Sequence, residues 1–217
     1  SNDYVDCGTS AISNTSFSIS VWLNADTTSS SGTMVGSYRW QLGQRSFYFR
    51  RNGSKIQFLI SSNGSSASGN VQLTSVSSIS IAAWYHAAVT WDAASGAMKL
   101  FLNGALEATG TQTAMAPIVE PLTIGAYSSI ESYFNGKLDD VRLYQSVLTQ
   151  AEITHLASSR GVEGPAPVGL GGEQLWLCPS LNDSADDISG NGNDGTYEGG
   201  MGTVADTSEG GSYAYDF

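Results

Sequence analysis

The residue with the clearest chemical potential in this sequence is Asp139, within the segment FNGKLDDVRLY at residues 134–144. If this segment forms a strand, alternation places Asp139 on the same face as the apolar Val141 and Leu143. A carboxylate among apolar side chains needs a partner, because an unpaired buried charge is too costly to keep. Two partners fit: a set of hydrogen-bond donors, or a bound cation.

Other side chains that often carry chemistry are few. His86 falls on a predicted strand and His155 on a predicted helix. Without a nearby cysteine or second histidine, they form neither a zinc site nor a catalytic triad. A disulfide between Cys7 and Cys178 would close a loop of more than about 100 residues, worth roughly 5 kcal/mol by chain entropy. The alternative is two buried free thiols, and the spacing does not decide between them.

The charge of the chain restricts its partners. Acidic residues outnumber basic ones 20 to 9, which gives a formal charge of −11. We therefore expect neither nucleic acid nor an anionic membrane as a partner, while cations and neutral glycans stay open. The sequence is rich in Gly, Ser, Thr and Asn, has no apolar run of about 18 residues and opens with no signal segment. These features predict a mature or excised extracellular domain.

Short alternating segments predict that the chain is mostly β. In FSISVWLN (residues 17–24), Phe17, Ile19, Val21 and Leu23 share one face, which indicates a half-buried strand. Asn52-Gly53 and Asn103-Gly104 predict tight hairpins. Strands are expected near residues 2–7, 17–24, 46–50, 55–61, 70–74, 84–92, 97–102, 105–110, 122–125, 138–143, 175–179, 196–200 and 213–217.

One helix is expected, after Thr149, because Thr149 and Glu152 have the spacing of a capping box. A Gly/Pro-rich segment at residues 160–174 follows it and is the one clear linker. We therefore predict a single domain over residues 1–217, with a main body at 1–159 and a tail at 175–217. The fold class predicted is an all-β, two-sheet antiparallel jelly roll with one short helix.

Five segments, taken in order, carry a family signature. FSISVWLN, WYHAAVTWD, MKLFLNGAL, LTIGAY and FNGKLDDVRLYQSVLTQAEI resemble the laminin-G-like branch of the concanavalin A-like lectin and glucanase jelly rolls. The segment LWLCPSLNDSADDISGNGNDGTYEGG is similar to the start of such a domain, and YAYDF to its next strand. The resemblance implies a sandwich that holds ligands on its loops or faces.

The order of these segments is unusual. In the family, the strand that YAYDF resembles is followed directly by the one that SNDYVDCG resembles, yet here they are the last and first residues. The chain therefore resembles a circularly permuted domain or one register of a tandem array. We expect the tail to complete its own domain, because Trp176, Leu177, Tyr213 and Phe217 would otherwise be exposed. Pairing of residues 213–217 beside residues 2–7 would indicate permutation.

The resemblance and the density of oxygen ligands together predict a structural Ca²⁺ site. Asp187, Asn191 and Asn193 in the loop at residues 186–193 would share the ion with Asp139, since Ca²⁺ takes six to eight oxygens in a flexible geometry. The alternative is a loop whose side chains bond their own backbone, with Asp139 accepting backbone amides. Asp140, on the opposite face, is the weaker ligand candidate.

Glycan binding is the second function that the resemblance implies. Aromatic side chains stack on sugars, and the candidates in or beside loop-like segments are Tyr38, Trp40, Tyr127 and Tyr133, with Tyr48 beside them. Trp22, Trp84, Trp91 and Phe101 stand at regular strand positions and are assigned to the core. The alternative for all of them is burial beneath loops.

Catalysis is not expected. Glucanases of this fold carry E-x-D-x-x-E on one strand, and the glutamates here are scattered with no such motif. The sequence therefore predicts a non-catalytic, secreted or surface-displayed domain for carbohydrate binding or adhesion. The rival hypothesis is a structural repeat of an extracellular layer, filament or virion that binds neighbouring copies, by strand addition for example.

Overall fold

The computed structural model of the chain describes most of the sandwich. It describes residues 3–9, 11–39, 42–65, 68–127, 132–158, 160, 173–177, 184–199, 203–205 and 213–217. Two candidate site residues, Trp40 and Cys178, lie outside these ranges. Residues 161–172 of the predicted linker also lie outside them.

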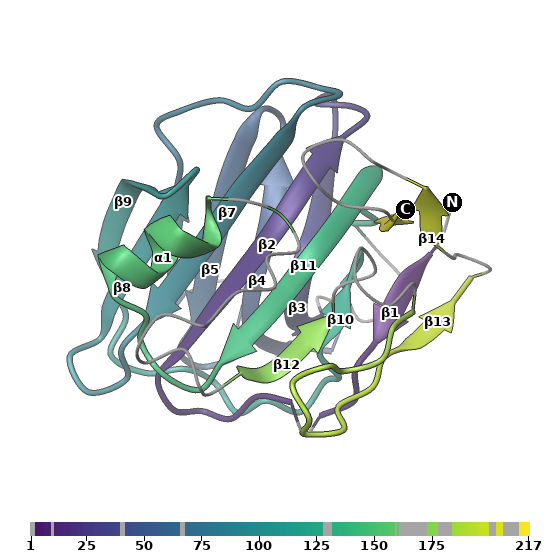
Figure 1. Cartoon of the computed structure of the whole chain (residues 1–217). Coiled ribbons are helices and arrows are strands. Elements are labelled where there is room, and N and C mark those ends of the chain that lie inside the picture. Colours follow the sequence, from purple (N-terminus) through teal and green to yellow (C-terminus); the bar gives the residue numbers. More distant parts are fainter. Residues whose placement is uncertain are drawn as a thin grey trace.

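Two antiparallel sheets pack face to face, which confirms the predicted jelly-roll class (Figure 1). Within the described residues the first sheet has seven strands, in the spatial order β13 (Thr196–Glu198), β1 (Tyr4–Asp6), β10 (Thr123–Ile124), β3 (Ser31–Arg39), β4 (Gln44–Asn52), β5 (Lys55–Ser61) and β6 (Asn70–Thr74). The described part of the second sheet runs β14 (Thr203–Ala205), β15 (Tyr213–Asp216), β11 (Gly136–Tyr144), β2 (Phe17–Ala25), β7 (Trp84–Trp91), β8 (Ala97–Leu102) and β9 (Ala105–Thr111), with β12 (Glu173–Leu177) also pairing β11.

The hydrophobic core lies between the sheets and follows the alternation of the strands. Strand β2 contributes Phe17, Ile19, Val21 and Leu23, as predicted. The expectation of a half-buried strand was wrong, however, because Ser18, Ser20 and Trp22 are also buried. They lie on the outer face of the second sheet, and Trp22 Nε1 donates to the carbonyl of Leu156 in the helix that covers this face.

That helix, α1 (Gln150–Leu156), packs on the outer face of the second sheet, where Figure 1 shows it in front of β7 and β8. Its capping box is formed as predicted: Thr149 and Glu152 each accept from the other's backbone N–H. Ile153 and Leu156 are its buried residues, and they join Tyr144 and Phe101 in a second apolar cluster. Strands β2, β7 and β11 are therefore largely buried on both faces, whereas β9 is mostly exposed.

Both predicted hairpins are present. Gly53 and Ser54 connect β4 to β5, one position beyond the predicted Asn52-Gly53, because Asn52 still pairs with Lys55. Asn103 and Gly104 connect β8 to β9 and both have positive φ, 49° and 78°. Two consecutive positive φ values are what a type I′ turn requires, and its twist matches that of the strands.

The strands of the predicted tail pair with strands of the predicted main body in the same molecule. β12 and β15 both pair with β11, and β13 pairs with β1. Residues 213–217 do not lie beside β1, because β15 belongs to the second sheet and β1 to the first. The pairing that would indicate permutation is thus not formed among the described strands, and circular permutation stays a prediction.

Phe217, which follows β15, attaches the end of the described tail to the sandwich. Its backbone exchanges two hydrogen bonds with Gly136, and its side chain is 7% exposed. The ring lies against Gly125, whose φ is +89°, and a Cβ on Gly125 would overlap the ring. Glycine is needed here both for the backbone conformation and for the space.

We expect Gly125→Ala to destabilise the fold by roughly 2–4 kcal/mol, since it combines a strained backbone with overpacking. The measurement is urea unfolding followed by tryptophan fluorescence. Gly8→Ala is the matched control, because Gly8 has a φ of +66° but no atom within 4 Å of an added Cβ. The Gly125→Ala cost should shrink in a Phe217→Ala background. Equal costs for Gly125→Ala and Gly8→Ala would contradict the packing of Phe217 on Gly125.

Candidate functional site

Asp139 lies on the outer, helix-covered face of the second sheet, and not on the core face that alternation predicts. The core cluster takes Leu138, Val141 and Leu143 from β11, so the faces change register between Leu138 and Val141. A β-bulge opposite β2 between Asp139 and Arg142 causes the change, with Asp140 at a φ of +49°. Predicted alternation fails here because a bulge adds one residue to the strand.

An arginine pairs with the buried Asp139 carboxylate. Arg160 Nε stands 3.4 Å from Asp139 Oδ2, and both side chains are fully buried. The Arg160 guanidinium carbon lies 3.9 Å from the ring centre of Trp84, at the start of β7. Asp139 Oδ1 also accepts from the backbone N–H of Asp140 at 2.8 Å. This carboxylate therefore joins the first residue of the predicted linker to the sheet.

Asp140, the weaker candidate in the sequence, connects the tail to the body. Its carboxylate accepts from Arg142 Nε at 2.7 Å and Nη2 at 3.0 Å, and from Trp176 Nε1 at 2.8 Å. The Arg142 guanidinium stacks 4.1 Å from the centre of the Trp176 ring. Trp176 belongs to β12, so a charge pair in β11 holds the first strand of the tail.

His86 and Ser20 complete this buried polar layer. Ser20 Oγ lies 2.7 Å from His86 Nε2, and both residues are at most 1% exposed. Burial lowers the pKa of His86 from 6.5 to about 4, with Asp140 and Arg142 as smaller, opposing influences. His86 is therefore neutral at physiological pH and is closed to solvent, consistent with a structural role. His155 is half-buried on α1.

The predicted calcium-binding loop is built around Asp187. Its carboxylate accepts from the backbone N–H groups of Trp176, Ser189 and Asn193 at 2.9 to 3.0 Å. The side-chain amides of Asn191 and Asn193 donate to the carbonyls of Glu173 and Gln174 in β12. These three residues thus lie together and fasten the loop to β12. For Asp139, the fourth predicted ligand, the contacts described above are with Arg160 and Asp140.

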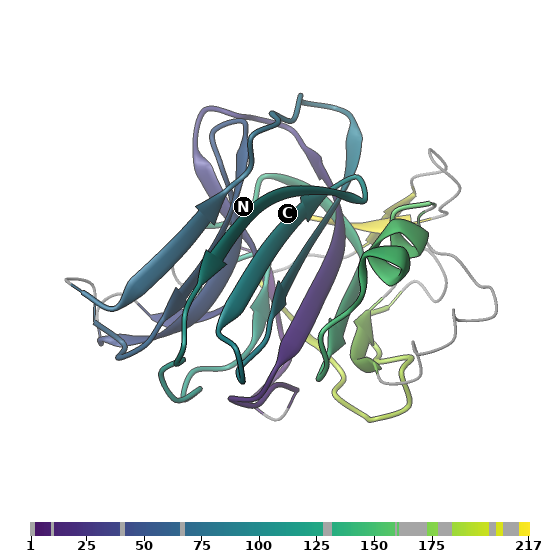
Figure 2. The same ribbon diagram turned by 90° about the vertical axis from the view of Figure 1, so that its left-hand side faces the viewer.

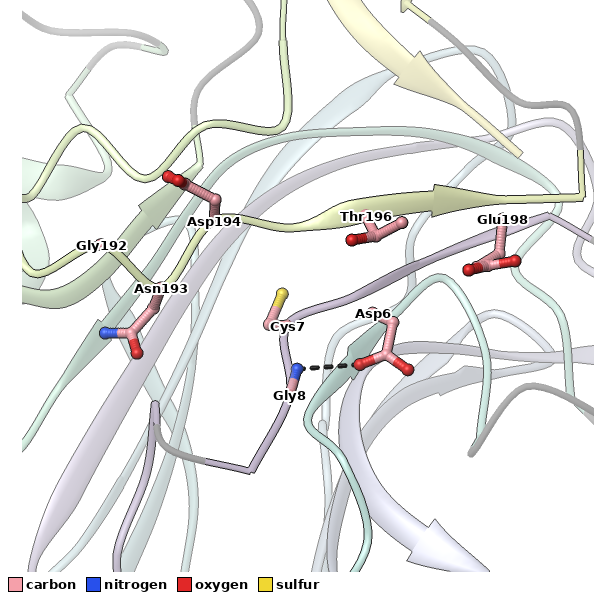
Figure 3. A pocket seen from close by; sticks show the side chains of 8 residues that line it. All are labelled: Asp6, Cys7, Gly8, Gly192, Asn193, Asp194, Thr196 and Glu198. Carbon is pink, nitrogen blue, oxygen red and sulfur yellow. Dashed lines mark hydrogen bonds between the residues drawn. The ribbon is translucent and has the colours of Figure 1, made fainter.

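A hollow of about 370 Å³ opens beside this loop, and residues in and next to the paired strands β1 and β13 line it (Figure 3). Its lining includes three carboxylates, from Asp6, Asp194 and Glu198, and Figure 3 shows Asp194 and Glu198 at opposite ends. In the described parts of the chain no group of three or more His, Cys, Asp or Glu side chains could hold a metal ion. The hollow therefore presents dispersed negative charge, and the Ca²⁺ site stays a prediction.

Cys7 lines the same hollow as a buried free thiol. Burial raises its pKa far above the ordinary value, and the charges of Asp6 and Asp187 raise it further. As a free thiol, Cys7 is therefore protonated and unreactive. Because Cys178 lies outside the described residues, the disulfide between the two stays a prediction.

Two of the four predicted sugar-binding aromatics come together on the outer face of the first sheet. Tyr38 and Tyr127 lie with ring centres 5.0 Å apart, and Tyr48 joins them at 5.2 and 5.7 Å. Tyr133 lies elsewhere, where burial and then Tyr4 and Asp3 raise its pKa. The three clustered rings are only 4 to 8% exposed. They form a packed base and not an open stacking surface.

Two rows of side chains cross this outer face from β4 to β6. The register pairs Tyr48 with Leu59 and Leu59 with Gln72. Arg50 pairs with Gln57, and Gln57 with Thr74, in the neighbouring row. These positions alternate with Phe47, Phe49, Phe58 and Leu73, which point into the core.

Hydrogen bonds fix the orientation of the polar side chains in these rows. Arg50 Nη1 donates to Tyr127 Oη at 2.9 Å and Arg50 Nε to Gln57 Oε1 at 3.0 Å. Tyr48 Oη donates to Gln72 Oε1 at 2.6 Å. The Arg50 guanidinium lies 4.3 Å from the centre of the Tyr48 ring. Burial raises the pKa of Tyr48 and Tyr127, so both keep their phenol protons.

Sequence reasoning did not select Arg50, Gln57 or Gln72 for this site. The only local signal is the alternation of aromatic and polar residues in SFYFRR, residues 46–51, which places Tyr48 and Arg50 opposite the core phenylalanines. The partners Gln57, Gln72 and Tyr127 come from other strands, so their meeting depends on strand order.

The comparisons with known proteins agree with this architecture. A laminin-G model described as concanavalin A-like lectin/glucanases superfamily matches residues 1–154, which confirms the family resemblance. No curated protein sequence matches the chain. Among the described residues, no helix is long and apolar enough to cross a membrane.

Solved structures share the fold at low identity. A proposed carbohydrate-binding protein from Bacteroides ovatus ATCC 8483 is 19% identical with a TM-score of 0.69, over 92% of this chain and 56% of that one. The Ruminococcus gnavus IT-sialidase CBM40, bound to α2,3-sialyllactose, is 16% identical with a TM-score of 0.56, over 67% and 84%. Domain 4 of AbnA, a GH43 extracellular arabinanase from Geobacillus stearothermophilus, in complex with arabinotriose, is 21% identical with a TM-score of 0.51, over 68% of each chain.

The low pKa of His86 predicts a loss of stability in mild acid. Between pH 6.5 and about 4 the unfolded chain binds a proton at this residue and the folded chain does not. The free energy of unfolding should therefore fall as pH falls through this window, by roughly 3 kcal/mol in total from this residue. Urea unfolding across the window should show a smaller decrease in His86→Gln. Equal decreases in both proteins would contradict the prediction.

The predicted Ca²⁺ site has its own test. If Ca²⁺ binds at Asp139, Asp187, Asn191 and Asn193, excess Ca²⁺ should raise the melting temperature and a chelator should lower it. A hundredfold excess over Kd stabilises by about 2.7 kcal/mol. Differential scanning fluorimetry measures both, with Mg²⁺ as the control. An unchanged melting temperature in both titrations would rule the site out.

Proposed function

Because the chain belongs to the concanavalin A-like lectin/glucanases superfamily, we propose that it is a carbohydrate-binding domain whose site is the outer face of the first sheet, across β4, β5 and β6. The domain would act without catalysis, in adhesion or ligand capture on a cell surface or in a secreted protein. The observation that carries the proposal is the pair of locked rows, Tyr48–Leu59–Gln72 and Arg50–Gln57–Thr74.

Sugar recognition needs fixed polar groups, since each hydroxyl of a sugar both donates and accepts hydrogen bonds. Guanidinium and amide groups offer planar sets of donors and acceptors. Here Arg50 and Gln57 are held by hydrogen bonds, while Gln72 and Thr74 are exposed at the end of the rows. Such preorganisation reduces the conformational entropy that binding would otherwise cost.

The tyrosines would support the site from below. Since Tyr38, Tyr48 and Tyr127 are nearly buried, their ring faces are occupied by one another and by arginine. The hydroxyl groups of Tyr48 and Tyr127 instead orient Gln72 and Arg50, respectively. This role differs from the direct stacking predicted from the sequence for Tyr38 and Tyr127.

The structural neighbours support the same class of ligand. Two of the proteins with this fold hold an oligosaccharide, α2,3-sialyllactose in one and arabinotriose in the other. Among the residues of the two rows there is no carboxylate, whereas the glycosidases of this fold need two. Because the chain spans 56% of the Bacteroides ovatus protein, the role of any larger protein that contains it is also a proposal.

A glycan array followed by isothermal titration calorimetry tests the proposal. We expect Gln72→Ala to weaken the Kd of an array hit about 3- to 10-fold, the effect of one hydrogen bond. The matched control is Gln150→Ala, on α1 over the opposite sheet. A blank array, or equal weakening by both variants, would overturn the assignment of this face.

A further inference from the structure

The charges of this chain are strongly segregated. Between Asp26 and Asp92 the sequence contains no Asp or Glu, although the chain has 20 acidic residues in all. The same stretch holds five of the nine basic residues, namely Arg39, Arg45, Arg50, Arg51 and Lys55. Its formal charge is therefore +5, and the rest of the chain carries −16, since the total is −11.

This basic stretch forms β3, β4, β5 and β6 and therefore most of the first sheet. Arg51 is fully buried and donates to the carbonyls of Ser30 and Gly53. Arg45 and Arg50 lie over the rings of Tyr38 and Tyr48. A nearby acid on this sheet's side is Glu120, whose carboxylate is 3.6 Å from Arg39. Of these basic residues, Arg45 and Arg50 are thus the two that lie over the tyrosine cluster.

Arg50 differs from the arginines of the second sheet in how its charge is balanced. Arg142 and Arg160 each pair with a carboxylate, Asp140 and Asp139. The hydrogen bonds of Arg50 go to the neutral groups of Tyr127 and Gln57, and no carboxylate among the described residues pairs with it. It is half-buried, so its charge is partly desolvated without being neutralised.

We propose that the ligand of this face is an anionic sugar, bearing a carboxylate or a sulfate, whose charged group binds Arg50. This inference rests on the proposed carbohydrate-binding function and adds the charge of the ligand to it. A guanidinium forms two parallel hydrogen bonds with either anion, and such charge-assisted bonds are about twice as strong as neutral ones. Gln72 and Thr74 then contact the sugar hydroxyls at the other end of the rows.

The overall negative charge does not oppose such binding at close range. At physiological ionic strength the screening length is about 8 Å, so a ligand at Arg50 interacts mainly with the charges beside it. Among them is Arg45, which lies over the Tyr38 ring in the same tyrosine cluster. The net charge instead affects the association rate at low salt, where the field of the whole molecule reaches further.

The test compares sugars that share one core. We would measure Kd by calorimetry for lactose, 3′-sialyllactose and 3′-sulfolactose, and for polygalacturonate against its methyl ester. Anionic members should bind at least about tenfold tighter than their neutral partners, the effect of one charge-assisted contact. 3′-Sialyllactose and polygalacturonate carry carboxylates, and 3′-sulfolactose carries a sulfate. Comparing their affinities therefore shows which of the two anions this face prefers.

Variants identify the residue responsible. Arg50→Gln should remove the preference and bring the anionic Kd to that of the neutral sugar, while Arg50→Lys keeps part of it. Lys99→Gln is the matched control, since it removes the same charge from an exposed position on β8. A thermal melt of each variant reports whether the tyrosine cluster stays folded. The ratio of the neutral Kd to the anionic Kd, measured in the same variant, separates the loss of the charged contact from a general weakening of the site.

The outcomes separate the two proposals. Equal binding of neutral and anionic partners, both reduced by Gln72→Ala, would overturn the anionic ligand and leave carbohydrate binding in place. Binding to none of the anionic probes would also overturn the anionic ligand, and the glycan array then decides on carbohydrate binding separately. A preference that survives in Arg50→Gln would overturn the assignment to Arg50.

Discussion

The fold depends on two adjacent carboxylates that a β-bulge turns toward the same buried layer. Asp139 and Asp140 each take an arginine, and each arginine stacks on a tryptophan: Arg160 on Trp84, and Arg142 on Trp176. Buried ion pairs are costly to desolvate and add little stability over apolar residues of the same size. Once formed, however, neither partner can leave without stranding the other. The pairs therefore specify where Arg160 and strand β12 lie after α1.

This layer determines which surface of the sandwich is left for binding. The helix α1 and the strands β12 and β15 occupy the outer face and edge of the second sheet (Figure 2). Arg142, Arg160 and His86 are enclosed there and cannot meet a ligand. The first sheet keeps a polar outer face, with Gln72 and Thr74 exposed. Arginine thus serves a structural role on the second sheet, whereas Arg50 on the first sheet is half-buried and would contact the ligand in the proposed site.

The contrast between the two sheets is one of charge balance. On the second sheet the arginines come with carboxylates from the same chain, whereas Arg50 on the first sheet is bonded to neutral groups. The net charge of −11 does not distinguish the two sheets, and taken alone it favours cations and neutral sugars as partners. The local arrangement favours an anionic sugar, because screening limits each charge to its own neighbourhood.

The sequence by itself determined the features that depend on neighbours along the chain. The alternation of Phe17, Ile19, Val21 and Leu23, the turn at Asn103-Gly104 and the capping box of Thr149 and Glu152 all formed as predicted. Each is local, because a strand, a turn or a cap is encoded within a few residues. The family signature likewise follows from the order of such segments.

Only the tertiary structure decided which side chains meet across strands. Alternation put Asp139 in the core, and the bulge at Asp140 moved it to the outer face, since one added residue reverses every face beyond it. Arg50 and Tyr127 touch although 77 residues separate them, and Asp140 and Trp176 although 36 do. Strand order and register bring these residues together, and neither is visible in the local pattern of the sequence.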